Sequence, residues 1–144
     1  MVNGQFKTRK HSNLITNGTF TGSAAGWVLT GHVAYYGAAG LVVYSSANTA
    51  INGVVAQVVP TSAAHQYQLK WTWGHNGTVG PRGSVEVVDV QTSAIIAASP
   101  NQADGVFTLN FTAQGPVNLR FIDTSTNTIN QDLTLDNVSL LKLT

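Results

Sequence analysis

The clearest pattern in the chain is a strict alternation of large apolar and polar side chains between Tyr67 and Trp73. The apolar positions are Tyr67, Leu69, Trp71 and Trp73, and the positions between them are polar. A period of two predicts a β-strand with one buried face. Because these large side chains all point to the same side, a second layer of structure must cover them. We therefore expect this segment to be the central strand of a two-sheet sandwich.

Other short segments with strand character follow one another along the chain, separated by residues typical of turns. The candidates are residues 32–36, 41–45, 54–59, 84–90, 94–97, 106–112, 117–123 and 133–143. The intervals are too short for crossover helices, and no segment has a sustained helical period. The sequence therefore predicts an all-β chain that forms a single antiparallel β-sandwich.

The first part of the chain contains two different elements. Residues 13–20 are expected to form a short edge strand with a turn at Asn17 and Gly18. Residues 1–12 carry a cluster of basic side chains and little apolar content, which predicts an extended arm that does not fold by itself. The expected organisation is therefore a basic arm, residues 1–12, followed by a sandwich, residues 13–144.

The arm has two interpretations. It could be a solvated tail, because terminal segments are often disordered. It could instead bind a neighbouring subunit of an assembly through Lys7, Arg9 and Lys10, with Phe6 as an apolar anchor. Binding to nucleic acid is not expected, because so few charges without a basic body release few counterions.

Composition narrows the functional classes. The chain has 144 residues, the size of one domain, and no cysteine, which excludes disulfides, thiolate metal sites and thiol catalysis. Charged residues make up only 9% of the chain, against about 25% in an ordinary soluble domain. Such a polar, weakly ionic surface is typical of many adhesive or assembled β-proteins. The sequence shows no secretory signal and no apolar run that would span a membrane, so we expect no membrane partner.

Five segments together carry a family likeness. They read NLITNGTF at 13–20, GW at 26–27, VAQVV at 55–59, YQLKW at 67–71 and LTLDNVSL at 133–140. In this order they resemble the jelly-roll carbohydrate-binding modules of the family 4, 9 and 22 type. The resemblance runs from about Asn13 to Leu143 and implies a galactose-binding-like β-sandwich with jelly-roll topology.

The resemblance also implies how the two ends of the sandwich meet. In that family the opening Asn-Gly-x-Phe and closing Asp-x-Val-x-Leu segments lie close together, and Trp27 matches a packed tryptophan. An acidic residue after the Phe helps the closing Asp, here Asp136, to hold a structural calcium ion, but this chain has Thr21 at that position. One carboxylate supplies few of the oxygen ligands that a hard cation needs. We therefore expect no cofactor, and expect Asp136 to bond to backbone at the strand junction.

Glycan binding needs flat aromatic faces beside polar side chains, in a groove or on a loop rim. Trp71 lies in mid-strand and is expected in the core. Trp73 reaches the strand end beside a glycine-rich loop, so that a core role and a binding role both remain open. Of Tyr35 and Tyr36, one must point inward and the other outward. The candidates are Tyr35, Tyr36, Tyr44, Trp73, His75, Asn76 and Arg82.

Catalysis is not expected. Glycoside hydrolysis needs two carboxylates on either side of a cleft, and the six acidic residues are scattered along the chain. No nucleophile-elbow motif is present, and the four histidines do not have the spacing of metal ligands.

Two functional hypotheses follow. The favoured one is a non-catalytic structural protein, a decoration (cement) protein on the surface of a phage virion. This protein would bind capsid or other assembly subunits, with its arm across a neighbour, and form a homo-oligomer. The alternative is a stand-alone carbohydrate-binding module that recognises a polysaccharide or cell-surface glycan, extracellular if a signal was removed. Fold likeness alone does not decide between them.

Overall fold

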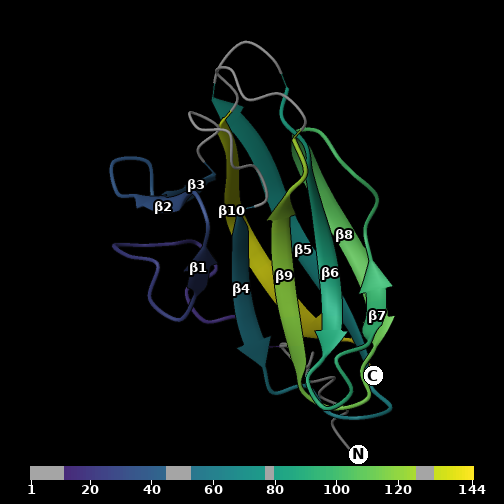
Figure 1. The fold of residues 1–144 in the computed structure, drawn as a ribbon. Coiled ribbons are helices and arrows are strands. Elements are labelled where there is room, and N and C mark those ends of the chain that lie inside the picture. The colour runs from purple at the N-terminus through teal and green to yellow at the C-terminus, as the bar shows by residue number, and fades with distance from the viewer. Residues whose placement is uncertain (1–11, 45–52, 77–79, 126–131) are drawn as a thin grey trace, which may run out of the picture.

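The computed structural model describes residues 12–44, 53–76, 80–125 and 132–144. Within these residues the chain forms ten strands and no helix. The strands build two sheets that face each other (Figure 1), with the sheet around β9 in front of the sheet around β10. The predicted all-β antiparallel sandwich is confirmed.

Each sheet has five strands and is named after its middle strand. The β9 sheet has the order β1 (Val28–Thr30), β4 (Val54–Val59), β9 (Val117–Asp123), β6 (Gly83–Asp89) and β7 (Ile95–Ala98). The β10 sheet has the order β2 (Val33–Tyr36), β3 (Leu41–Tyr44), β10 (Asp132–Lys142), β5 (Gln66–Asn76) and β8 (Gly105–Thr112). All neighbouring strands are antiparallel. From β3 onward the chain changes sheet at every connection except the one between β6 and β7.

The aromatic segment that dominates the sequence pattern is β5, and its position differs from the prediction. β5 lies between β10 and β8, whereas the centre of the sheet is β10, which pairs with both β3 and β5. The alternation itself is as expected, because Tyr67, Leu69 and Trp71 are all buried. β5 is therefore an inner strand but not the central one.

Residues 13–20 do not form the predicted edge strand. The predicted turn at Asn17 and Gly18 is present, since the Phe20 amide donates to the Asn17 carbonyl, and Asn17 and Phe20 have left-handed φ angles of 53° and 49°. The Asn17 side chain stabilises the resulting turn, because its Nδ2 donates to the carbonyl oxygens of Ser23 and Ala25. The edge strand beside β4 is instead β1, which the pattern did not predict.

The opening segment is attached to both sheets by neutral hydrogen bonds. The Leu14 amide donates to the Leu140 carbonyl and the Val138 amide donates to the Gly18 carbonyl, both at 2.9 Å. On the other side, the Gln57 side chain of β4 exchanges two hydrogen bonds with the backbone of this segment. The expected closeness of the opening and closing motifs is therefore confirmed.

β10 contains a β-bulge at the place where the opening segment meets it. Asn137 and Val138 together oppose the single residue Trp71 of β5, and Asn137 has a φ angle of 53°. Gly18 packs so closely against this bulge that a Cβ at position 18 would clash with the Val138 carbonyl oxygen. The position therefore requires glycine for steric reasons.

The core between the sheets is aromatic, and Phe121 of β9 is its common partner. Its ring makes edge-to-face contacts with Trp27, Trp71 and Trp73, at centroid distances of 5.9, 6.2 and 6.2 Å. The buried Tyr44 hydroxyl donates to the Phe121 carbonyl at 2.8 Å. The core assignments of Trp27 and Trp71 are confirmed, since both side chains are buried.

Gly18→Ala should lower the free energy of unfolding by about 1–3 kcal/mol, because the added methyl group overpacks the contact with the β10 bulge. Gly80→Ala is a matched control, since a Cβ there meets nothing within 4 Å, and it should change stability by less than about 0.5 kcal/mol. Urea unfolding of both variants measures the difference. Equal stabilities would contradict the close packing of Gly18.

Candidate functional site

The two outer faces of the sandwich have opposite chemistry. On the β10 sheet every second side chain points away from the core, and among the described residues these positions are mostly amides, hydroxyls and a few charges. The polar outer face contains Gln66, Gln68, Lys70, Thr72, Thr108, Asn110, Thr112, Thr134, Asp136 and Ser139. Such side chains both donate and accept hydrogen bonds, and therefore suit a ligand with many hydroxyl groups.

A hollow of about 240 Å³ lies at one end of the polar outer face. It is lined by Gln66 of β5 and by Asn110, Phe111 and Thr112 of β8. The strand pairing explains why these residues meet, because Gln66 is opposite Thr112 and Gln68 is opposite Asn110. Two amide side chains and a hydroxyl thus converge on one depression.

Tyr36 of β2 supplies an exposed aromatic ring on the same face. Its side chain is 53% exposed, and it is the only large exposed aromatic residue in the described part of the chain. Tyr35 points the other way, because it is paired with the buried Val42 and packs against the core. The structure therefore identifies Tyr36 as the outward residue of this pair.

Burial excludes two of the aromatic candidates, Trp73 and Tyr44, from contact with a ligand. Trp73 is 1% exposed, because its ring lies against Phe121 and Tyr44 and fills the space beside Gly83. The prediction that Trp73 contacts a ligand is therefore wrong, and its core role is the correct one. Tyr44 is also fully buried, and burial together with the charge of Asp123 raises the pKa of its hydroxyl well above the ordinary value.

The remaining candidates, His75, Asn76 and Arg82, are exposed but lie away from the hollow. His75 and Asn76 are at the opposite end of β5 from Gln66, and His75 Nδ1 is 3.4 Å from Asp104 Oδ2. Arg82 precedes β6 in the other sheet. None of these three residues lines the hollow.

The hollow was missed because its residues come from distant segments. The alternation of Asn110 and Thr112 with buried phenylalanine and leucine positions was visible in the sequence and indicated an outward polar row. Only the register of β8 against β5 shows that Gln66 joins this row.

Asp136 lies on the polar outer face beside the bulge. Its Oδ1 accepts a hydrogen bond from the Asn137 amide at 2.8 Å, which is the backbone contact expected for it. Partial burial raises the pKa of its carboxyl, and the same hydrogen bond partly offsets this effect. Among the described residues no group of three or more histidine and acidic side chains could hold a metal ion.

The predicted assembly arm, with Phe6, Lys7, Arg9 and Lys10, lies outside the described residues. None of the described segments forms a helix that is long and apolar enough to cross a membrane.

No protein-family model and no curated protein matches the sequence. Solved structures do match in fold. The second N-terminal cellulose-binding domain of β-1,4-glucanase C from Cellulomonas fimi has a TM-score of 0.65 at 16% identity, covering 95% of this chain and 98% of that domain. TmCBM61 in complex with β-1,4-galactotriose has a TM-score of 0.62 at 13% identity, covering 92% of this chain and 99% of that one.

A phage protein is also similar. The enzymatically active domain of tailspike protein 4 from bacteriophage CBA120 has a TM-score of 0.62 at 16% identity over 91% of this chain, which spans only 21% of the tailspike chain. The chain therefore has the jelly-roll fold of carbohydrate-binding modules, a fold that also occurs within a phage tailspike.

Proposed function

We propose that this chain is a non-catalytic glycan-binding module whose ligand lies on the polar outer face of the β10 sheet. The observation that carries the proposal is the combination of the exposed Tyr36 ring with the amide-lined hollow on one face. An aromatic ring stacks on the apolar face of a sugar, and amide and hydroxyl groups bond to its hydroxyls. The low charge of the face suits a neutral glycan.

The positions of these groups favour an extended sugar chain over a single sugar. Tyr36 is on β2, one edge of the sheet, and the hollow lies beside β8, the other edge. Strands are about 4.8 Å apart, so the two features are separated by about 19 Å across the sheet alone. A ligand that reaches both must be an oligosaccharide or polysaccharide. The galactotriose and cellulose ligands of similar modules support this class.

A catalytic role has no support among the acidic residues, all six of which lie in the described part of the chain. Asp89 and Asp123 are buried at the last positions of β6 and β9, where Asp89 accepts from Thr92 and Asp123 accepts from Ser125. Glu86 is paired with Arg120 on the opposite face of the sandwich. A general acid and base flanking a bound glycan would have to come from Asp104, Asp132 or Asp136, which lie outside the hollow.

Tyr36→Ala should weaken glycan binding by about tenfold or more, a loss of about 1.4 kcal/mol, because the stacking surface is removed. Tyr36→Phe keeps the ring and should bind as the native protein does. Calorimetric titration with β-1,4-galactotriose and with cello-oligosaccharides measures the affinities.

Val58→Ala, on the opposite outer face, is the control for this experiment and should leave the affinity unchanged. Binding that is insensitive to Tyr36→Ala would place the ligand elsewhere. No binding to either sugar class or to a wider set of neutral polysaccharides would contradict the proposal.

We also propose that no calcium ion is needed at Asp136, because its contact is to backbone and because, among the described residues, it is not part of a group of three or more histidine and acidic side chains that could hold a metal ion. Partial burial raises the pKa of Asp136, so the folded state loses stability as the pH rises through that pKa. Asp136→Asn should therefore equal or slightly exceed the native melting temperature at pH 7.

At about pH 3, below the ordinary aspartate pKa, both proteins are neutral at this position and should melt alike. EDTA should leave the melting temperature of the native protein unchanged, because a tightly bound ion would stabilise by mass action. A fall with EDTA that calcium restores, together with destabilisation by Asp136→Asn, would show a metal site.

A second candidate function is decoration of a phage particle at the virion surface, which the likeness to the phage tailspike supports. The two functions are compatible, because a surface protein of a virion can also bind host glycans. In this role the basic residues Lys7, Arg9 and Lys10, with Phe6, would attach the module to capsid or other assembly subunits.

Deletion of residues 1–11 should weaken attachment to emptied particles and leave glycan affinity intact, and raised salt should reproduce part of the loss by screening the charges. Cosedimentation of the intact and truncated proteins with particles, at low and high salt, measures this. Equal occupancy under all conditions would contradict the role of the arm.

A further inference from the structure

The outer face of the β9 sheet, here called the apolar face, has more aliphatic side chains than the polar face on the other side of the sandwich, although Thr30, Ser84, Glu86, Asn118 and Arg120 also point outward from it. Val28, Val58 and Ile95 are 65%, 59% and 57% exposed, and each points away from the core from a different strand. Val54, Ala56, Val88 and Ile122 fill positions between them at half-buried sites. Val28, Val54, Ala56 and Val58 are neighbours on β1 and β4, and a contiguous group of exposed aliphatic side chains indicates a surface that binds a partner.

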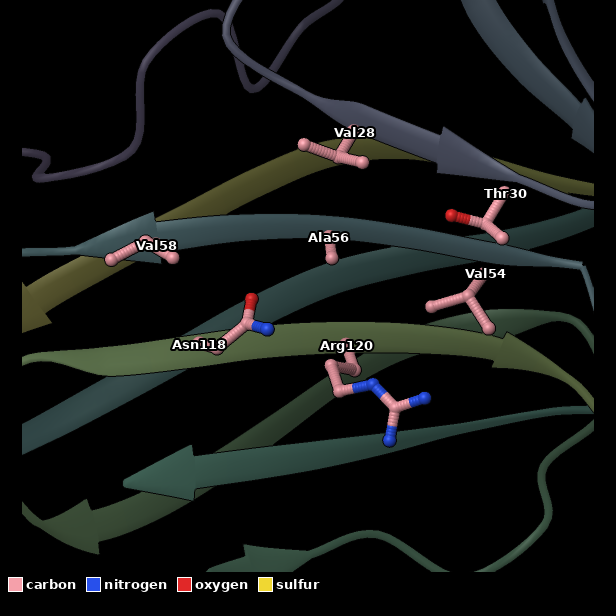
Figure 2. A pocket seen from close by; sticks show the side chains of 7 residues that line it. All are labelled: Val28, Thr30, Val54, Ala56, Val58, Asn118 and Arg120. Atoms are coloured by element: carbon pink, nitrogen blue, oxygen red, sulfur yellow. The ribbon is translucent and has the colours of Figure 1, made fainter. Parts of the chain in front are cut away.

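A hollow of about 270 Å³ lies within this apolar face. Figure 2 shows its lining side chains on β1, β4 and β9, namely Val28, Thr30, Val54, Ala56, Val58, Asn118 and Arg120. The hollow forms because Ala56 is small and lies between Val28 and Arg120 in the strand register. An aliphatic side chain of a partner would fit between the surrounding valines.

The charges on this face are balanced. Arg120 Nη1 donates to Glu86 Oε2 at 2.8 Å, and both side chains are partly exposed. These are the only charged side chains among the described residues that point outward from the β9 sheet. Two copies of the face can therefore approach each other without like-charge repulsion.

We infer that the outer face of the β9 sheet binds the same face of a second copy of this chain, related by a two-fold axis. A two-fold interface uses the same patch on both partners, so the patch must be complementary to itself. This patch meets the requirement, because it has a hollow with an exposed Val58 in its lining and one cation beside one anion. Arg120 of each copy can then pair with Glu86 of the other.

The arrangement places the two polar outer faces on opposite sides of the dimer, pointing to solvent. If those faces bind glycan, as proposed above, the dimer is bivalent and gains avidity on a polymeric or surface-bound ligand. Only this gain in avidity rests on the proposed function, because the dimer itself depends on the apolar face alone.

Sedimentation equilibrium of the full chain between about 1 µM and 1 mM tests the inference, because this range covers weak to moderate dimers. We expect a monomer–dimer equilibrium in this range. Val58→Asp should weaken the association by about tenfold or more, since a charge would enter an apolar contact.

Val106→Asp is the matched control, because Val106 is 61% exposed but lies on β8 of the other sheet. It should leave the dimer unchanged. A native chain that stays monomeric up to 1 mM, a dimer insensitive to Val58→Asp, or equal loss with Val106→Asp would each overturn the inference.

A charge exchange tests the two-fold pairing in proteins whose fold is intact by circular dichroism. Arg120→Glu and Glu86→Arg should each weaken self-association, because like charges then face each other across the axis. An equimolar mixture of the two variants should dimerise more strongly than either variant alone. A mixture no stronger than the single variants would overturn the interface.

Glycan titration of the same proteins separates this inference from the proposed function. A dimer that binds no glycan leaves the interface in place and removes the function. A Val58→Asp monomer that keeps its affinity for a soluble oligosaccharide but loses retention on a polysaccharide matrix supports both the dimer interface and the glycan-binding function.

Discussion

The sandwich depends on one ring, that of Phe121, which joins the two sheets. It is the shared edge-to-face partner of Trp71 and Trp73 from β5 and of Trp27 from the loop before β1. Each such pair adds about 0.5–1.5 kcal/mol beyond the burial of its area. Nearly all aromatic side chains in the described part of the chain are buried or partly buried in the core, and Tyr36 is the exposed one.

This division assigns separate tasks to the inside and to the two outer faces. Most inward positions in both sheets are apolar and serve stability. Outward positions differ between the sheets, with mostly amides and hydroxyls on β5 and β8 and valines on β1 and β4. A surface with so few charges can bind a neutral glycan on one side and pack against an apolar partner on the other.

The sequence predicts the strands well, because their period of two is a local property, but it does not predict what depends on neighbours. Trp71 could be placed in the core from mid-strand parity. Trp73 could not be assigned to the core in this way, because its burial depends on Gly83 of the other sheet. Residues 13–16 look like a strand by composition, yet they belong to no strand of the structure, and only the turn predicted at Asn17 is present. The hollow joins Gln66 to Asn110, and only the β5–β8 register brings them together.

The junction at the bulge of β10 shows how the chain closes its core with few charges. Asn13 accepts hydrogen bonds from the amides of Ile15 and Leu140, and Gln57 bonds to both polar groups of the Thr16 backbone. These amide contacts connect the opening segment to β4 in one sheet and to β10 in the other. An ion holding the same segments would need several oxygen ligands around it. Side-chain amides instead satisfy the backbone directly, and Asp136 is a partly buried carboxyl bonded to the Asn137 amide.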